Sequence, residues 1–559
     1  MPQSSVSSRA WLTGARPYGL LVALCLLLYL PGIAAIPPLD RDEARFAQAT
    51  RQMLETGDFL RIRFQDEARN KKPAGIYWLQ AASVNLFSAP ESTAIWPYRL
   101  PSFLGATLAV LLTFGFGARL MHSGSDPPAG RRIAFFAAVL LGTSLGLMTE
   151  AHIAKTDAAL LAAIVAGQGA LGLAYLRTRA GEPVSGWIAA VFWIAQGAAI
   201  LLKGPAGPML AVVTAAALSI ADRDLRWLRG LRPVAGLVFV AAILTPWVIA
   251  IERATESRFL ADSLGQDLLM KLIGAQESHG APPFAYLLLS ILTFWPGSLV
   301  LVPALVRGWR RLDMPAERFL IAWLVPAWAL LELVPTKLPH YVLPLYPALA
   351  ILAAAALIDG MAHGGWARRA DVAVKALWSI VTLALATALV FLPLRFGGPL
   401  VAAVIGAVLL LGLGAAVLYR HSRAAVGIAA LAALAVIFIA VAGSAVLPGL
   451  ERLWLSRAAA ILVAEHPRQA GTPLVSIGYS EPSLVFLVGT DIRLTTPRGG
   501  ADALAAGGGE ALVSNREEAV FRQALNARGL VAQPLGSAPG FNYSNGQRVV
   551  LTLYRVAPG

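Results

Sequence analysis

The residues best suited to chemistry stand in a short polar stretch, LDRDEARF, at residues 39–46. It holds three carboxylates and two guanidiniums within six residues, directly after the first long apolar run. Ionisable side chains beside a membrane span are costly to desolvate, which favours a functional reason for them. We therefore predict that the acids Asp40, Asp42 and Glu43 form the chemical centre of the protein, with Arg45 as a basic partner one helical turn after Asp42. The alternative is that these acids only stabilise the N-terminus of an interfacial helix.

A second polar stretch, NKKP at residues 70–73, places two ammonium groups where another interfacial helix is expected to begin. Backbone N–H groups at a helix N-terminus also attract anions, so Lys71 and Lys72 are candidates for binding a lipid phosphate. Simple attraction to anionic headgroups is the alternative.

Three further lysines stand beside helix breakers or at span ends, in KTD at 155–157, LKGP at 202–205 and TKLPHY at 336–341. One lysine that snorkels to the membrane surface is ordinary, and Lys155 could simply pair with Asp157. Three such sites on one face instead favour polyanion binding. The candidates from these stretches are Lys155, Asp157, Lys203, Lys337 and His340.

Neither a resident metal nor a nucleotide site is supported by the sequence. Glu277 and His279, with Asp42 or Asp157, could bind a divalent cation, but no ligand spacing supports a required metal, and we expect no cofactor. The single cysteine, Cys25, excludes a disulfide framework and a cysteine metal site. No P-loop or dinucleotide fingerprint is present.

Composition indicates an integral membrane protein. Hydrophobic residues make up 57% of the 559 and charged residues only 14%, whereas soluble domains are about a quarter charged. The net charge of +14 is typical of arginine and lysine retained in cytoplasmic loops, and we expect no nucleic-acid partner.

Apolar runs of about 17 to 25 residues predict membrane-spanning helices. About thirteen are expected, near 18–36, 99–121, 132–150, 157–176, 187–202, 206–220, 234–251, 285–306, 319–335, 340–358, 375–393, 399–419 and 424–447. The first is too long for a signal-peptide core and is interpreted as a retained span. The two short predicted spans on either side of Lys203, 187–202 and 206–220, could instead be one broken pair.

Every second connection between these spans is rich in arginine, which predicts that it is cytoplasmic. The arginines concerned are 131, 132, 177, 179, 223, 226, 229, 232, 307, 310, 311, 318, 368, 369, 420 and 423. The N-terminus is then inside, and everything after about Leu447 is outside. All the polar stretches described above fall on the outer face.

Two domains are expected. Residues 1–447 form the transmembrane domain, with two long outer loops at 37–98 and 252–284; the first loop carries helices near 43–56 and 76–87 that lie at the interface. Residues 448–559 form a small outer α/β domain, with strands near 474–479, 483–488 and 548–554 and a helix near 516–528.

Taken in order, the stretches 40–47, 70–78, 155–158, 202–205 and 336–344 resemble the bacterial lipid A aminoarabinose transferases. These belong to the GT-C superfamily of polyprenyl-phosphate-sugar-dependent glycosyltransferases, which is related to the protein O-mannosyltransferases. The resemblance covers the membrane half and implies an all-α polytopic GT-C fold. It also implies an acidic catalytic position at Asp42 or Glu43, a second acid at Asp157, and carrier-phosphate contacts at Arg45 and Lys72. Tyr341 and Tyr346 are the implied pocket residues.

The same resemblance implies a monomeric enzyme of the bacterial inner membrane. Its donor would be undecaprenyl phosphate carrying 4-amino-4-deoxy-L-arabinose, its acceptor a phosphate of lipid A, and its mechanism an inverting single displacement at the periplasmic face. Capping that phosphate would confer resistance to polymyxin and other cationic peptides. One alternative is a related transferase that moves mannose or another sugar to protein or another lipid. Another is a transporter of lipid-linked sugars, although no internal repeat supports it.

Overall fold

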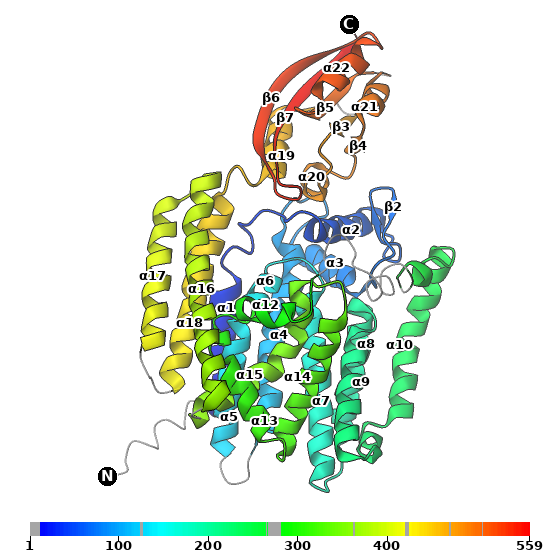
Figure 1. The fold of residues 1–559 in the computed structure, drawn as a ribbon. Coiled ribbons are helices and arrows are strands. Elements are labelled where there is room, and N and C mark those ends of the chain that lie inside the picture. Colours follow the sequence, from blue (N-terminus) through cyan, green and yellow to red (C-terminus); the bar gives the residue numbers. More distant parts are fainter. Residues whose placement is uncertain are drawn as a thin grey trace.

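The protein is a bundle of helices with a small α/β domain at one end (Figure 1). The computed structural model describes residues 12–122, 127–263, 265, 281–360, 364–419, 424–468, 471–505 and 507–558. Two shorter helices, α2 (Asp42–Thr56) and α3 (Gly75–Phe87), lie between the bundle and the α/β domain. A two-stranded ribbon of β1 (Arg63–Phe64) and β2 (Glu67–Ala68) joins them.

Eight helices in the described part of the chain are long and apolar enough to cross a membrane. They are α4 (Trp96–Leu120), α7 (Asp157–Arg179), α8 (Gly186–Lys203), α10 (Pro233–Ala254), the unit Pro339–Asp359 containing α15 (Tyr346–Asp359), α16 (Gly365–Phe396), α17 (Leu400–Tyr419) and the unit Ala424–Gly449 containing α18 (Ala424–Val441). The pair α5 (Pro127–Gly142) and α6 (Leu145–Ala151), bent by 62°, makes a ninth if it is counted as one span.

The remaining predicted spans also contain helices, although these are shorter or interrupted. They are α1 (Arg16–Tyr29), α9 (Ala206–Asp222), α12 (Ala285–Thr293), α13 (Leu301–Arg310) and α14 (Pro315–Leu333). The first predicted span, 18–36, extends too far, because the helix α1 ends at Tyr29, just before Pro31. The single helix predicted over 285–306 is wrong: the chain leaves helical geometry around Pro296, so α12 and α13 are separate.

The C-terminal residues form a five-stranded mixed sheet in the order β4-β3-β5-β7-β6. Its strands are β3 (Leu474–Ile477), β4 (Arg493–Thr495), β5 (Gly509–Ser514), β6 (Leu530–Asn542) and β7 (Gln547–Pro558). β3 pairs parallel with β4 and β5, whereas β7 pairs antiparallel with β5 and β6. Four helices accompany the sheet: α19 (Leu455–Glu465), α20 (Pro482–Val488), α21 (Pro497–Leu504) and α22 (Glu518–Asn526).

The strand predicted over 483–488 is a helix, α20. A short apolar run does not distinguish a strand from a buried helix by periodicity, and Pro482 stands in the first helical turn, where proline favours a helix. The strand predicted near 474–479 and the helix predicted near 516–528 correspond to β3 and α22.

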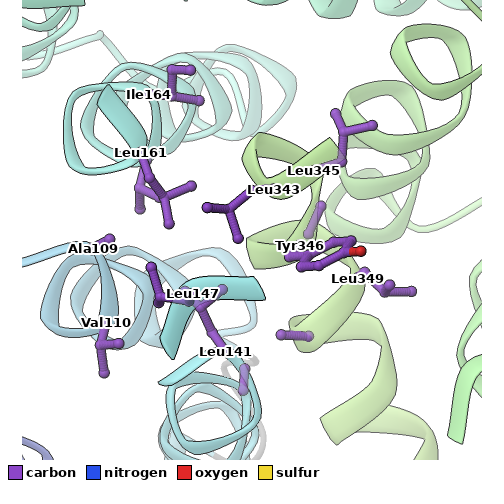
Figure 2. Packing of buried hydrophobic residues seen from close by; sticks show 14 of the residues in the cluster. Ala109, Val110, Leu141, Leu147, Leu161, Ile164, Leu343, Leu345, Tyr346 and Leu349 are labelled. Carbon is purple, nitrogen blue, oxygen red and sulfur yellow. The ribbon is translucent and has the colours of Figure 1, made fainter. Parts of the chain in front are cut away.

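The main hydrophobic core joins the helices whose ends carry the polar stretches. Figure 2 shows Val110 of α4, Leu147 of α6, Leu161 of α7 and Leu349 of α15 packed together, and all four are fully buried. At Gly105 of α4 an added Cβ would lie 2.6 Å from backbone atoms of Ala159, so the two backbones touch directly. The start of α7, and with it Asp157, is therefore fixed against α4.

Candidate active site at one end of the bundle

Asp157, the first residue of α7, is the centre of a compact group of charges. Its Oδ1 accepts a hydrogen bond of 2.5 Å from Lys203 Nζ at the end of α8, and its Oδ2 lies 3.7 Å from Lys155 Nζ. His340 Nε2 is 3.8 Å from Oδ1. The aromatic ring of Tyr341 lies 5.2 Å from Lys203 Nζ, measured to its centroid. Three of the predicted polar stretches therefore meet at one carboxylate.

Glu150 of α6 belongs to the same group, and sequence reasoning missed it. Its Oε1 lies 3.0 Å from Lys155 Nζ, which is itself 3.4 Å from His340 Nδ1. Burial alone would lower the pKa of Lys155, but the carboxylates of Glu150 and Asp157 raise it above its ordinary value, so the ammonium stays charged. The only available signal was an acid five residues before Lys155 inside an apolar run.

The two remaining stretches approach this group from the first loop. Asp42 begins α2 with an exposed side chain, and its charge contributes to the raised pKa of Lys155. Lys72, just before α3, lies within electrostatic reach of His340. All five polar stretches thus converge at one end of the bundle. Asp42 is exposed and Lys72 is half-buried, and we call the side on which they lie the open side of the cluster.

Other predicted site residues lie around or outside this group. Lys71 is exposed and Arg45 is half-buried near Asp42 on α2. Lys337 donates to the carbonyls of Glu332 and Val334 at the end of α14, so its ammonium is engaged there. Tyr346 is buried among apolar side chains (Figure 2), and its hydroxyl pairs with Thr293.

The metal candidates Glu277 and His279 lie outside the described residues. Within the described ranges, no group of three or more histidine, cysteine, aspartate or glutamate side chains is arranged to hold a metal ion.

Glu43 faces away from this group despite adjoining Asp42. Its carboxylate receives Arg99 Nε and Nη2 at 2.8 Å each, together with the backbone N–H groups of Leu39 and Ala154. Both side chains of the ion pair are 0% exposed. Arg99 also donates to the carbonyls of residues 33, 36 and 37. Glu43 and Arg99 thereby connect α2, α4, the segment after α1 and the loop before α7. Both carboxylate oxygens of Glu43 are occupied by these donors, so neither is left for a substrate.

A close backbone contact positions Lys72. A Cβ added at Gly75 would lie 2.6 Å from the carbonyl oxygen of Leu201, two residues before Lys203. The N-terminus of α3 and the C-terminus of α8 therefore touch, which holds the lysines at 72 and 203 on neighbouring elements.

We expect Gly75→Ala to separate these helix ends. The forced backbone shift should cost about 1–3 kcal/mol of unfolding free energy and weaken binding of a phosphate anion between Lys72 and Lys203. Unfolding in detergent and phosphate titration measure the two effects. The matched control is Gly197→Ala in α8, where an added Cβ meets no atom within 4 Å. Equal behaviour of the two variants would contradict a positioning role for the Gly75 contact.

An apolar groove of about 520 Å³ lies between α3, α4, α7 and α8. Its walls include Leu79 and Leu86 of α3, Leu104 of α4, Ala163 of α7 and Leu202 of α8. Leu202 adjoins Lys203, so the groove brings an apolar surface next to the lysines.

The sequence matches known families in its membrane half. Residues 20–258 match the family model described as dolichyl-phosphate-mannose-protein mannosyltransferase. A relative named undecaprenyl phosphate-alpha-4-amino-4-deoxy-L-arabinose arabinosyl transferase, from Erwinia tasmaniensis, is 29% identical over 383 residues, which cover 67% of this chain and 66% of the relative. A protein of the same name, numbered 1, from Pseudomonas fluorescens is 28% identical, with 61% of each chain covered. The matches span 66% and 61% of these two relatives, which is less than two thirds of either.

The fold is similar to solved structures along almost its whole length. The crystal structure of ArnT from Cupriavidus metallidurans bound to undecaprenyl phosphate gives a TM-score of 0.74 at 19% identity, covering 97% of this chain and 98% of that one. An Archaeoglobus fulgidus oligosaccharyltransferase gives 0.52 at 14% identity, covering 95% and 72%. The chain is therefore similar in sequence to the named arabinosyl transferases over its membrane half, and it shares its fold with the solved structure of ArnT.

Proposed function

We propose that the protein transfers 4-amino-4-deoxy-L-arabinose from undecaprenyl phosphate to a phosphate of lipid A at the outer face of the inner membrane. The observation that carries this proposal is the meeting of Lys72, Lys155 and Lys203 with Asp42 and Asp157 beside an apolar groove. An amphiphilic phosphate donor needs both a cationic and an apolar surface. The names of the curated relatives support the choice of sugar and carrier.

The donor phosphate would lie against Lys72 and Arg45, with Lys203 and the Tyr341 ring behind them. Breaking the bond between sugar and phosphate leaves negative charge on the carrier, and fixed cations stabilise that charge as it develops. Asp157 holds Lys203 and Lys155 in place and balances their charges. The groove between α3, α4, α7 and α8 would take the first part of the polyprenyl chain.

Asp42 is the proposed catalytic carboxylate because it is exposed at the open side of the cluster. A phosphomonoester acceptor has a second pKa of about 6, so it is already anionic at neutral pH. A general base to remove its proton is therefore hardly needed. Asp42 would instead steady the positive charge that develops on the sugar, or hold its ammonium group, during an inverting single displacement. Lys155 and His340 would face the acceptor phosphate, and Glu43 acts as a positioning residue.

Membrane topology follows the charge distribution. We propose thirteen crossings, with the N-terminus and the arginine-rich loops in the cytoplasm, and with the first loop and residues 448–559 in the periplasm. We propose that the protein acts as a monomer.

Lys72→Ala should weaken use of the donor by one charge-assisted contact, about 1.5–3 kcal/mol, or roughly 10- to 150-fold in kcat/KM. The measurement is transfer rate against donor concentration. Lys375→Ala is the matched control, since that lysine of α16 is exposed and pairs with Asp371, outside the charged group. Unchanged donor dependence in Lys72→Ala would move the phosphate site elsewhere.

The function is tested with purified protein, defined donors and lipid A, followed by mass spectrometry of the lipid. We expect the mass increase of one aminopentose with the aminoarabinosyl donor and none with a mannosyl donor. Product from the mannosyl donor alone would favour a related transferase. Movement of intact donor across vesicles without any product would favour a transporter.

A further inference from the structure

The C-terminal domain contacts the helix that carries Asp42. Gln48 Nε2 donates to Thr490 Oγ1 at 2.7 Å, and Arg51 Nη1 donates to the carbonyl of Phe486 at 2.9 Å. Thr490 Oγ1 donates in turn to Glu55 Oε2. The α20 region of the C-terminal domain therefore bonds to polar side chains of α2. Figure 1 shows α20 next to α2.

The two residues just before Asp42 are held by the same domain. The backbone N–H of Asp40 donates to Tyr543 Oη at 2.7 Å, and Asp40 Oδ1 accepts from the N–H of Ser483 at 3.1 Å. Arg41 Nη2 donates to the carbonyl of Ser544. Burial raises the pKa of Asp40 to about 6, as expected for a carboxylate that the docked domain removes from water.

The backbone at this point is strained. Arg41 has a φ of +64°, in the left-handed region that non-glycine residues rarely adopt, and it directly precedes α2. Such a conformation persists only when surrounding contacts enforce it. Contacts with Asp40 and Arg41 come from the turn between β6 and β7, which is itself fixed because Glu481 accepts from the side chains of Asn542 and Ser544.

We propose that the C-terminal domain sets the position of Asp42, with Tyr543 as the main positioning residue. The domain forms hydrogen bonds with the chain on both sides of Asp42. They involve Asp40 and Arg41 before it and Gln48 and Arg51 after it. This inference rests on the proposed function. It gives residues 448–559 a role in the transfer step without any contact to substrate.

The test compares Tyr543→Phe with Tyr554→Phe. Each variant loses one tyrosine hydroxyl of the same domain, but the Tyr554 hydroxyl bonds Glu518, which is remote from α2. We expect Tyr543→Phe to lower kcat roughly tenfold, because a small displacement of a catalytic group is costly. The KM for the donor should rise by a smaller factor than kcat falls, since Lys72 and Lys203 lie on other elements and Arg45 is the one proposed phosphate contact on α2. Tyr554→Phe should keep wild-type kcat.

Two further measurements separate positioning from general destabilisation. Hydrogen exchange at the amides of residues 40–45 should accelerate in Tyr543→Phe and not in Tyr554→Phe, whether or not the assay supplies the right sugar. Asp40→Ala keeps the backbone N–H that donates to Tyr543 and removes the separate bond to Ser483, so the double variant should exchange faster at residues 40–45 than either single variant. Wild-type kcat and exchange in Tyr543→Phe would overturn the proposal. Absence of wild-type transfer would instead refute the proposed function, and the exchange data would still decide the positioning.

Discussion

Asp42→Asn should abolish transfer while leaving the protein folded and inserted. The substitution keeps the size of the side chain and removes the charge nearest the open side of the cluster. Charge stabilisation is the largest single contribution in many enzymes, and loss of one such group typically costs about 100- to 1000-fold in kcat. Mass spectrometry of lipid A after single-enzyme incubation gives the rate.

The matched control for this prediction is Asp66→Asn, an exposed carboxylate in the turn between β1 and β2 of the same loop. It should turn over like the wild type. If Asp42→Asn also retained wild-type turnover, Asp42 would be removed from the mechanism, and Asp157 would become the carboxylate to test next.

Glu43→Ala should be the most destabilising single change in the first loop. It leaves the guanidinium of Arg99 fully buried without its counter-charge, and removing one partner of a buried ion pair costs about 3–5 kcal/mol. The same change frees the N–H groups of Leu39 and Ala154. Thermal unfolding in detergent and the yield of inserted protein measure the loss, and activity should fall with them.

Glu182→Ala provides the comparison for Glu43→Ala, because the ion pair of Glu182 with Arg177 is exposed. Surface pairs contribute about 0–1 kcal/mol. A loss in Glu43→Ala no greater than this would mean that the Arg99 pair is not the anchor of the first loop.

The meeting of the polar stretches could be predicted from sequence because the arginine-rich loops fix which ends of the helices share a side. The lysines at 72, 155 and 203 then had to lie on one face, and the structure brings them close together. The sequence did not reveal what each neighbouring acid does. Asp40, Asp42 and Glu43 are adjacent, yet they face the C-terminal domain, the open site and the buried Arg99 respectively.

What could not be predicted depends on contacts between distant parts of the chain. The bond between Asp40 and Ser483 joins residues 443 positions apart, and neither residue carries a local signal for the other. Glu150 looked like an isolated polar residue in an apolar run until the folded chain placed it against Lys155. The break around Pro296 and the helical state of 483–488 were missed because apolar composition alone does not fix backbone geometry.

The most direct measurement labels introduced cysteines. The sequence has one native cysteine, Cys25, and its side chain is buried, so the introduced cysteine is the only reactive thiol. A membrane-impermeant thiol reagent should label Lys71→Cys in intact spheroplasts, and added undecaprenyl phosphate should slow that labelling. Arg226→Cys, in an arginine-rich loop, should react only after the membrane is opened. Labelling of Lys71→Cys from the cytoplasmic side alone, or at a rate that the phosphorylated polyprenol leaves unchanged, would contradict a lipid-phosphate site on the outer face.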